Sequence, residues 1–147
     1  MLYGNYSATV DPKGRLKLPA AIRPDLDQTH GPDFFVTSLD DGQSVRIYPM
    51  PVWKKIVDRI AEPPTFVPAK KKFLDQSTYW GQVVRIDGQG RLLIPSKLRD
   101  PAAMRGEVSV LGQVDKIVVW NEERLREHVK TSSLNDQDWE SLSNLGI

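Results

Sequence analysis

Two arginines in this chain stand in the same short motif, each four residues after an aspartate. The motif occupies residues 11–23 and returns without a gap 76 residues later, at residues 87–99. An aspartate, a glycine, an arginine, a leucine, a proline and a final arginine recur in register. A guanidinium presents several hydrogen-bond donors in a planar fork, which suits phosphate oxygens and the edges of nucleic-acid bases.

A purely structural interpretation of the motif is also available. Asp11 can cap its own turn and pair with Arg15, and Asp87 and Arg91 can do the same in the second copy. A surface arginine that only keeps the protein hydrated drifts easily between repeats, so its retention in both copies favours a contact with phosphate or with a base. The other basic residues of the two motifs would then hold the phosphate backbone, namely Lys13, Lys17, Arg23 and Arg99.

The sequence around each motif predicts a hairpin and then a short helix. Asp11-Pro12-Lys13-Gly14 has the residue order of a type I turn. In residues 15–18 the polar and apolar residues alternate, so Leu16 and Leu18 are expected in a core and the basic residues on the outer face. A proline then can open a short helix in each copy. Pro24 and Pro101 are expected to end these helices.

These residues resemble the MraZ family, whose halves are each similar to the swapped-hairpin DNA-binding domain of AbrB. The pattern D-x-K-G-R-L-x-[LI]-P-x-x-[FIL]-R, returning as D-x-Q-G-R-[LI]-L-I-P-x-x-L-R, carries the resemblance over roughly residues 1–130. It implies a mainly β fold with short helices (α+β), namely a duplicated swapped-hairpin, double-split β-barrel with internal pseudo-twofold symmetry. It also implies a repressor that assembles into a ring-shaped homo-oligomer and binds the promoter DNA of division and cell-wall genes.

The resemblance assigns DNA contact to the aspartate–arginine element, which here comprises Asp11 with Arg15 and Asp87 with Arg91. The two copies are not equivalent, because Leu93 holds the outer position that Lys17 has in the first. An apolar residue on an outer face indicates a covered surface. We therefore expect the first repeat to make the stronger DNA contact.

Composition and charge limit the other functions. The chain has 147 residues and a net charge of +1, with 11 basic and 8 acidic residues in positions 1–74 but 9 and 11 in positions 75–147. Such a monomer would bind DNA weakly, whereas linked copies in a ring gain effective concentration. No apolar run could cross a bilayer, and we expect no membrane association. The lack of cysteine excludes disulfides and fits a cytoplasmic protein, and the resemblance implies that it is nucleoid-associated.

The predicted organisation follows the repeat. We expect a first repeat over residues 1–62, a connection over 63–76, a second repeat over 77–130 and a C-terminal tail over 131–147. Because repeats of this size bury little surface alone, the halves are expected to share a core or to be stabilised by oligomerisation. Strands are predicted over residues 2–10, 34–37, 44–48, 77–86, 108–112 and 116–120, a loop over 25–33, and helices from near Val52 and after Asn121.

Two further segments carry specific expectations. Trp53 begins an apolar stripe at helical spacing and is predicted to lie in the core. Lys70-Lys71-Lys72 is interpreted as a solvated face in preference to a phosphate contact. In the tail, Trp139 and Leu142 have helical spacing, which leaves open a docking helix on a partner subunit or a frayed end. An alternative function is an antitoxin-like protein-interaction module that uses this tail, although antitoxins generally carry one repeat.

No catalytic site is predicted, and neither is a cofactor or a metal. His30 and His128 are isolated in the sequence, and no cluster has metal-ligand spacing. Gly88-Gln89-Gly90 precedes a strand rather than a helix, so it does not match a phosphate-binding loop. Asp11 and Asp87 could meet across a barrel as paired carboxylates. The arginine that follows each of them favours ion pairing instead, and we expect that the protein is not an enzyme.

Overall fold

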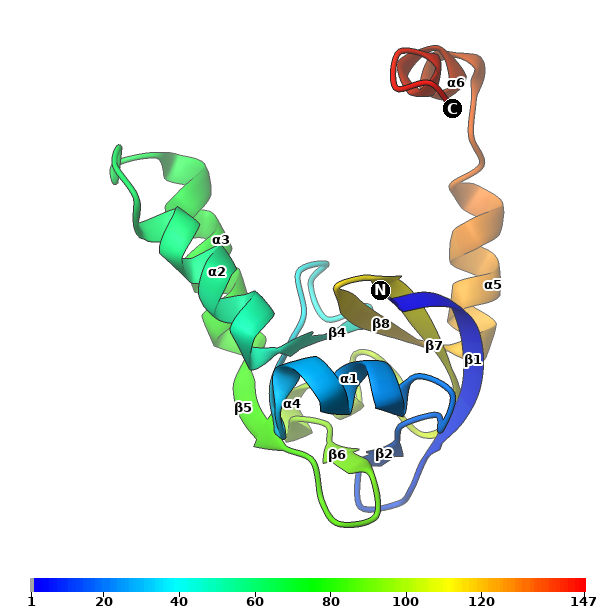
Figure 1. Ribbon diagram of the computed structural model, residues 1–147. Helices are drawn as coiled ribbons and strands as arrows, with labels where there is room; N and C mark the ends of the chain where they lie inside the picture. Colours follow the sequence, from blue (N-terminus) through cyan, green and yellow to red (C-terminus); the bar gives the residue numbers. More distant parts are fainter. Residues whose placement is uncertain (1) are drawn as a thin grey trace.

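A single antiparallel sheet curls into a nearly closed barrel (Figure 1). The computed structural model describes residues 2–147, apart from the side chains of residues 27–30. Within these residues the strands are β1 (Leu2–Val10), β2 (Arg15–Lys17), β3 (Asp33–Thr37), β4 (Val45–Pro49), β5 (Gln82–Arg85), β6 (Arg91–Leu93), β7 (Gly106–Val114) and β8 (Lys116–Asn121). The helices are α1 (Arg23–His30), α2 (Met50–Ala61), α3 (Pro68–Trp80), α4 (Ser96–Arg99), α5 (Glu122–Thr131) and α6 (Asp136–Ser143). The predicted mainly β fold with short helices is confirmed.

The two repeats exchange strands. The order around the sheet is β5-β3-β4-β8-β7-β1-β2-β6, with every pair antiparallel. Strand β1 of the first repeat therefore pairs with β7 of the second, while β5 of the second pairs with β3 of the first. When the order is closed into a ring through the contact between β5 and β6, interchange of β1–β4 with β5–β8 maps it onto itself. This is the pseudo-twofold symmetry that the resemblance implied. Neither repeat can complete its sheet alone.

Strands β2 and β6 form an antiparallel pair at the symmetry axis, with one strand from each repeat. Leu16 lies opposite Leu92 in this pair, and both side chains are fully buried. They belong to one apolar cluster that takes residues from both repeats, including Val36 of β3 and Val110 of β7. The core therefore fills the barrel and belongs to both halves, as the size of one repeat led us to expect.

Three local predictions are wrong. Residues 25–30 are helical and not a loop, and Pro24 lies in the first turn of α1 instead of ending a helix. Proline fits there because the first helical N–H groups need no partner within the helix. Residues 77–80 continue α3, so the strand begins only at Gln82. Tertiary contacts explain this result, because Ser77 and Trp80 are both buried and the Thr37 hydroxyl donates to the Ser77 carbonyl oxygen at 2.7 Å.

Helices α2 and α3 form an arm that leaves the barrel. The indole of Trp53 stacks on Phe35 with 4.3 Å between ring centroids and lies 5.8 Å from the ring of Phe73. This aromatic stack joins both helices to the sheet at the base of the arm. The predicted core position of Trp53 is confirmed, since its side chain is buried.

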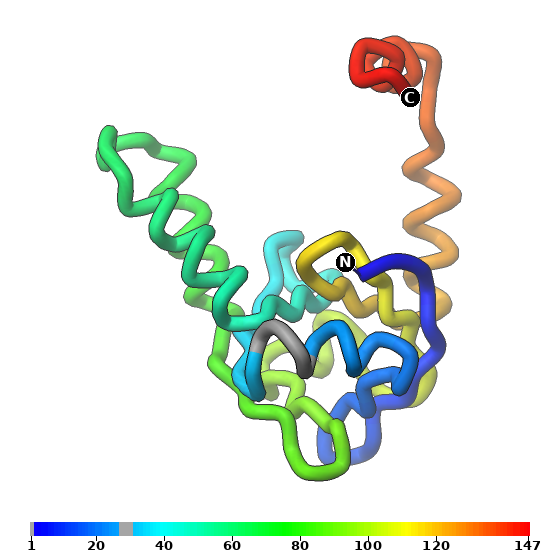
Figure 2. Tube along the Cα trace, in the orientation of Figure 1, coloured from blue at the N-terminus to red at the C-terminus, as the bar shows by residue number. Residues whose placement is uncertain are grey.

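Helices α5 and α6 form a second arm on another side of the barrel (Figures 1 and 2). The Asn121 side chain caps α5 by accepting from the Arg124 backbone N–H, as predicted, and Leu125 packs against the sheet. His128 also stacks on Trp120, and from Val129 to the C-terminus the arm is exposed except for the half-buried Asp138 and Leu142. No helix in residues 2–147 combines the length and the apolar composition that a membrane crossing requires.

The symmetric β2–β6 pair leads to a prediction about the stability of the fold. Leu16→Ala and Leu92→Ala should each lower the free energy of unfolding by about 2–5 kcal/mol, because each leaves a cavity in the shared core. Denaturant unfolding measures this loss. Leu93→Ala on the same strand is the matched control, since that side chain is 44% exposed. Losses that differ greatly between Leu16→Ala and Leu92→Ala would contradict the symmetry of the core.

Candidate nucleic-acid interface

The first motif folds into a turn whose aspartate binds the arginine that follows it. One carboxylate oxygen of Asp11 accepts from the backbone N–H groups of Lys13 and Arg15, both at 2.9 Å. The other oxygen accepts from Nε of Arg15 at 2.7 Å. The Gly14 N–H donates to the Asp11 carbonyl oxygen at 2.9 Å, which closes the predicted turn. Gly14 has a φ of +82°, which an L residue adopts only with strain.

The second motif repeats this arrangement atom for atom. Asp87 accepts from the backbone N–H groups of Gln89 and Arg91 at 2.9 Å and from Nε of Arg91 at 2.8 Å. The Arg15 and Arg91 side chains keep 32% and 26% of their surface exposed. Both turns lie at the same end of the barrel (Figure 1). The aspartates therefore have the structural role that was one interpretation of the motif, while the arginines stay accessible.

These hydrogen bonds stabilise the ionised carboxylates. The pKa of Asp87 is lowered to about 2, mainly by the hydrogen bond from the Arg91 backbone N–H. The pKa of Asp11 is lowered as well, and the Arg15 backbone N–H is the main cause. Each carboxylate is engaged by its own turn. This engagement argues against the shared-proton chemistry of a paired-carboxylate site.

Between the turns, β2 and β6 form a two-stranded ribbon with a basic outer face. Lys17 lies directly across from Arg91, and Arg15 lies across from Leu93. The ribbon is extended by one hydrogen bond at each end, from the Leu18 N–H to the Gly90 carbonyl oxygen at 2.9 Å and the symmetric bond to Gly14 at 2.8 Å. Three cations and one leucine thus share one face, which we call the ribbon face (Arg15, Lys17, Arg91 and Leu93).

The last arginine of each motif packs over the turn of the other motif. A Cβ atom added to Gly14 would lie 2.2 Å from Nε of Arg99, and one added to Gly90 would lie 2.5 Å from Nη1 of Arg23. The Arg99 Nε also donates to the Ile94 carbonyl oxygen at 2.9 Å. We call this arrangement the reciprocal arginine packing. Sequence reasoning missed it, although the glycine and the final arginine recurred together in both copies.

The remaining predicted basic residues are placed differently. Lys13 is exposed on the first turn, where the second turn has Gln89. Residues 70–72 lie on α3, on an arm that points away from the end that carries the turns (Figure 1). Lys70 donates to the carbonyl oxygens of Glu62 and Pro64, and Lys71 pairs with Asp75. The interpretation of this run as a solvated face is therefore favoured.

Comparison with known proteins identifies the family. The model of the family described as "MraZ protein, putative antitoxin-like" matches residues 81–142. A protein of Acidobacterium capsulatum named "Transcriptional regulator MraZ" is 40% identical over 147 residues, which cover the whole of both chains. The chain belongs to the MraZ family. A relative of the same name from Koribacter versatilis is also 40% identical over both full lengths, and one from Leuconostoc citreum is 33% identical over 94% of this chain and 93% of its own.

Membership in the MraZ family accounts for the fold and for the class of protein. The nearly closed barrel with exchanged hairpins is the architecture that the resemblance implied. The relatives carry the name of a regulator and not that of an enzyme, which agrees with the expectation of no catalytic activity. Among the residues whose side chains are described, no three acidic or histidine groups gather as metal ligands. His30 lies outside those residues.

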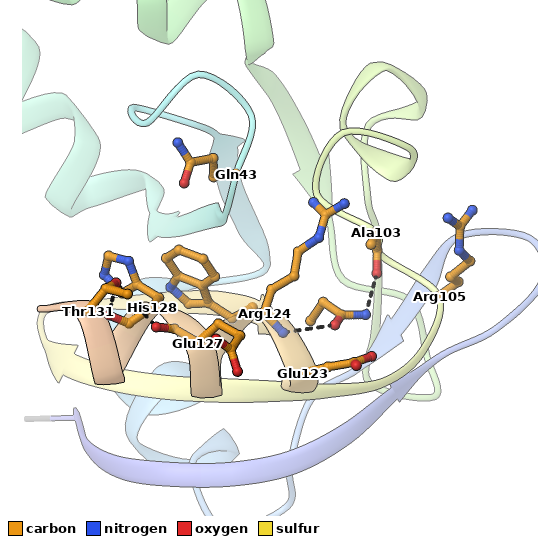
Figure 3. Close-up of a pocket in the computed structure, with 10 residues that line it drawn as sticks. Gln43, Ala103, Arg105, Glu123, Arg124, Glu127, His128 and Thr131 are labelled. Atoms are coloured by element: carbon orange, nitrogen blue, oxygen red, sulfur yellow. Dashed lines mark hydrogen bonds between the residues drawn. The ribbon is translucent and has the colours of Figure 1, made fainter.

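A concave surface lies between α5 and the barrel, away from the ribbon face (Figure 3). His128 is stacked on Trp120 here with 4.5 Å between ring centroids, so it is not isolated as the sequence suggested. Two of the polar groups tie the start of the helix to the barrel. The Asn121 amide donates to the Ala103 carbonyl oxygen at 3.2 Å, and the Arg124 guanidinium donates to the Pro101 carbonyl oxygen. The contacts favour an anchor for α5 over a ligand site.

The reciprocal arginine packing predicts a strict requirement for glycine. Gly14→Ala should cost on the order of 1–3 kcal/mol of unfolding free energy, because the new methyl group meets Arg99 and the positive φ is strained. Gly88→Ala is the control, since no heavy atom lies within 4 Å of its added Cβ. Adding Arg99→Ala to Gly14→Ala should recover part of the loss, and strictly additive losses would contradict the packing.

The turns also predict a pH dependence. Because the folded pKa of Asp87 is about 2 and its ordinary value is 3.8, the ionised form stabilises the fold at neutral pH. This stabilisation is lost as the pH falls from about 4 towards 2. Unfolding measured across that interval should be less pH-dependent in Asp87→Asn than in the parent chain. Asp100→Asn, at a side chain that is 93% exposed, should leave the profile unchanged.

Proposed function

We propose that this MraZ-family chain is a sequence-specific DNA-binding transcriptional regulator that acts as a repressor. The observation that carries the proposal is the ribbon face, with a turn of identical geometry on either side. The name of its relatives as transcriptional regulators supports the same class of function. The major groove of B-DNA admits a two-stranded β-ribbon, so the ribbon face has a size and a charge that suit it.

The placement of the charges supports an anionic ligand. Lys17 and Arg91 lie directly opposite each other on adjacent strands, and like charges in this position destabilise a sheet. Asp87 offsets part of this repulsion through its ion pair with Arg91, and a phosphate beside Lys17 would offset it further. Lys13 is exposed on the first turn, where its ammonium group can contact a second phosphate of the DNA. We assign phosphate contact to Lys13 and Lys17.

The arginines of the turns are the candidates for base recognition. Nε of Arg15 is already bonded to Asp11, so the two Nη groups remain as donors for a base edge, and the same holds for Arg91. The aspartate also limits the side-chain freedom that would be lost on binding. Arg23 and Arg99, which were candidates for phosphate contact, more directly support the opposite turn through the reciprocal arginine packing.

We extend the proposal to assembly and location. A chain of net charge +1 has little electrostatic affinity for DNA by itself, so several copies in a ring-shaped homo-oligomer would supply it through linked weak sites. The targets would be promoter DNA of division and cell-wall genes, in a cytoplasmic, nucleoid-associated protein. The repeats of residues 1–62 and 77–130 would each provide one turn, with residues 63–76 as the connection and 131–147 as a tail.

Replacement of Arg15 tests the proposal. Arg15→Ala should weaken binding to the DNA upstream of the protein's own gene by roughly 1–3 kcal/mol, because a base contact is lost. Gel shifts titrated with salt measure this loss, and the oligomer mass should stay constant. Arg126→Ala on α5 removes the same charge from an exposed side chain and serves as the control. Normal operator binding by Arg15→Ala would exclude the assigned contact.

A second candidate function rests on the exposed tail. Helix α6 presents Trp139 on an acidic segment, which would suit a protein-interaction module of the antitoxin type. Purification of the full-length chain from its host, followed by mass spectrometry, tests this alternative. A stoichiometric second protein that is absent when residues 131–147 are deleted would favour the alternative over DNA binding.

A further inference from the structure

The C-terminal helix has an apolar face without a partner in its own chain. Trp139 and Leu145 are 51% and 75% exposed, and α6 contains no buried residue. A capping box nevertheless fixes the start of the helix, with the Asn135 and Asp138 side chains each accepting the other's backbone N–H at 2.8 and 3.0 Å. An isolated helix of this length is marginal in water. A capped helix with an uncovered apolar face therefore fits a docking element.

The α2–α3 arm offers a groove of matching character. Half of its lining is apolar, and the rest includes two lysines and one aspartate; it is lined by Val57, Ile60, Ala61, Thr65, Lys70, Lys71, Leu74 and Asp75. The groove encloses about 370 Å³, and the side chain of Leu74 is 39% exposed there. An indole or a pair of leucine side chains would fill such a space and exclude water from its walls.

The charges of the two surfaces are complementary. The arm, residues 50–80, contains six basic and three acidic residues. The tail, residues 131–147, contains three acidic residues and no basic one. In α6 the acidic residues Asp136 and Asp138 lie in the first turn, close to the apolar Trp139. Within the groove Lys71 is paired with Asp75, so the complementary charge belongs to the arm as a whole. An acidic helix with an apolar face thus meets a basic arm with a partly apolar groove, which favours this pairing over a contact between like surfaces.

The divergence of the two arms favours docking between chains over docking within one chain. Figures 1 and 2 show that the two arms leave the barrel separately and diverge. Helix α5 is held to the barrel by Leu125 and by its Asn121 cap, and only residues 132–135 connect it to α6. At about 3.3–3.6 Å per residue, so short a link restricts how far the tail helix can move away from the end of α5.

We propose that residues 136–147 of one copy dock in the α2–α3 groove of a second copy. The proposal deepens the self-assembly part of the proposed function and rests on it. Since the helix and the groove are different surfaces, the contact is heterologous, and every copy keeps one free helix and one free groove for further neighbours. Such a contact generates a closed ring when the rotation between copies closes, and a filament when it does not.

Cysteine cross-linking tests the contact directly, because the chain has no cysteine of its own. A tagged full-length Leu142→Cys chain is mixed with an untagged Leu74→Cys chain and oxidised mildly. A disulfide between the two chains is expected. Val129→Cys, at an exposed apolar position on α5, replaces Leu142→Cys in the control and should give only background linkage. Equal yields in the two mixtures, or no linked pair, would overturn the proposal.

A second measurement separates docking within one chain from docking between chains. The full-length double variant carrying Leu74→Cys and Leu142→Cys is oxidised alone and then with an excess of the parent chain. Linked oligomers that are diluted out by the parent chain support docking between copies. A disulfide that forms within single chains, unaffected by the excess, would show that the tail folds back on its own arm and the proposal is wrong.

The assembly state provides the functional readout. Light scattering should show a higher-mass species for the parent chain, which full-length Leu142→Glu should lose and Val129→Glu should retain. If Leu142→Glu assembles normally, the tail does not hold the copies together, whether or not the chain binds operator DNA. If the tail proves necessary for assembly but the parent chain shifts no operator, the proposed DNA-binding function fails and the docking stands. A parent chain that is monomeric would exclude both the docking and the ring.

Discussion

The exchange of first strands between the repeats is the constraint on which the rest of the structure depends. A sheet stabilises its strands only where each has a neighbour, and β1 finds its long neighbour β7 in the other repeat. The same requirement places β5 beside β3. Both exchanges bring β2 and β6 together at the symmetry axis, where Leu16 and Leu92 close the core. The ribbon face exists because of this crossing, since neither repeat has both of its strands.

The pairing of β2 with β6 also brings each turn into contact with the opposite repeat. Each turn is closed internally by its aspartate and is then supported externally by an arginine from the other repeat. Arg99 lies against Gly14, and Arg23 lies against Gly90, so a movement of one turn must displace a side chain that belongs to the opposite half. Because buried packing tolerates little displacement, the spacing between Arg15 and Arg91 is fixed by the core. A fixed spacing would suit the proposed recognition of two sites along a duplex.

The barrel and the two arms carry different charged and apolar surfaces. The basic groups of the ribbon face lie at one end of the barrel, whereas the acidic tail extends from another side (Figure 1). The arms contribute Trp80 of α3, the Trp53 stack and Leu125 to buried contacts, and little beyond them. Their exposed apolar surfaces are therefore available for contacts between chains. The near-neutral net charge thus results from separate basic and acidic surfaces, which a sum over the sequence does not reveal.

The sequence by itself determined the repeat, the two turns, the alternation that buries Leu16 and Leu92, and the helices after each hairpin. These features are local, because turn chemistry and periodicity depend on residues a few positions apart. It did not determine that residues 77–80 are helical or that α1 begins at Arg23, because the contacts of Ser77, Trp80 and Leu26 with the core override the local pattern. Only the tertiary structure placed Arg99 against Gly14 and Lys17 against Arg91. Such contacts join residues that lie more than seventy positions apart, and no local rule of spacing encodes which strand of one repeat will pair with the other.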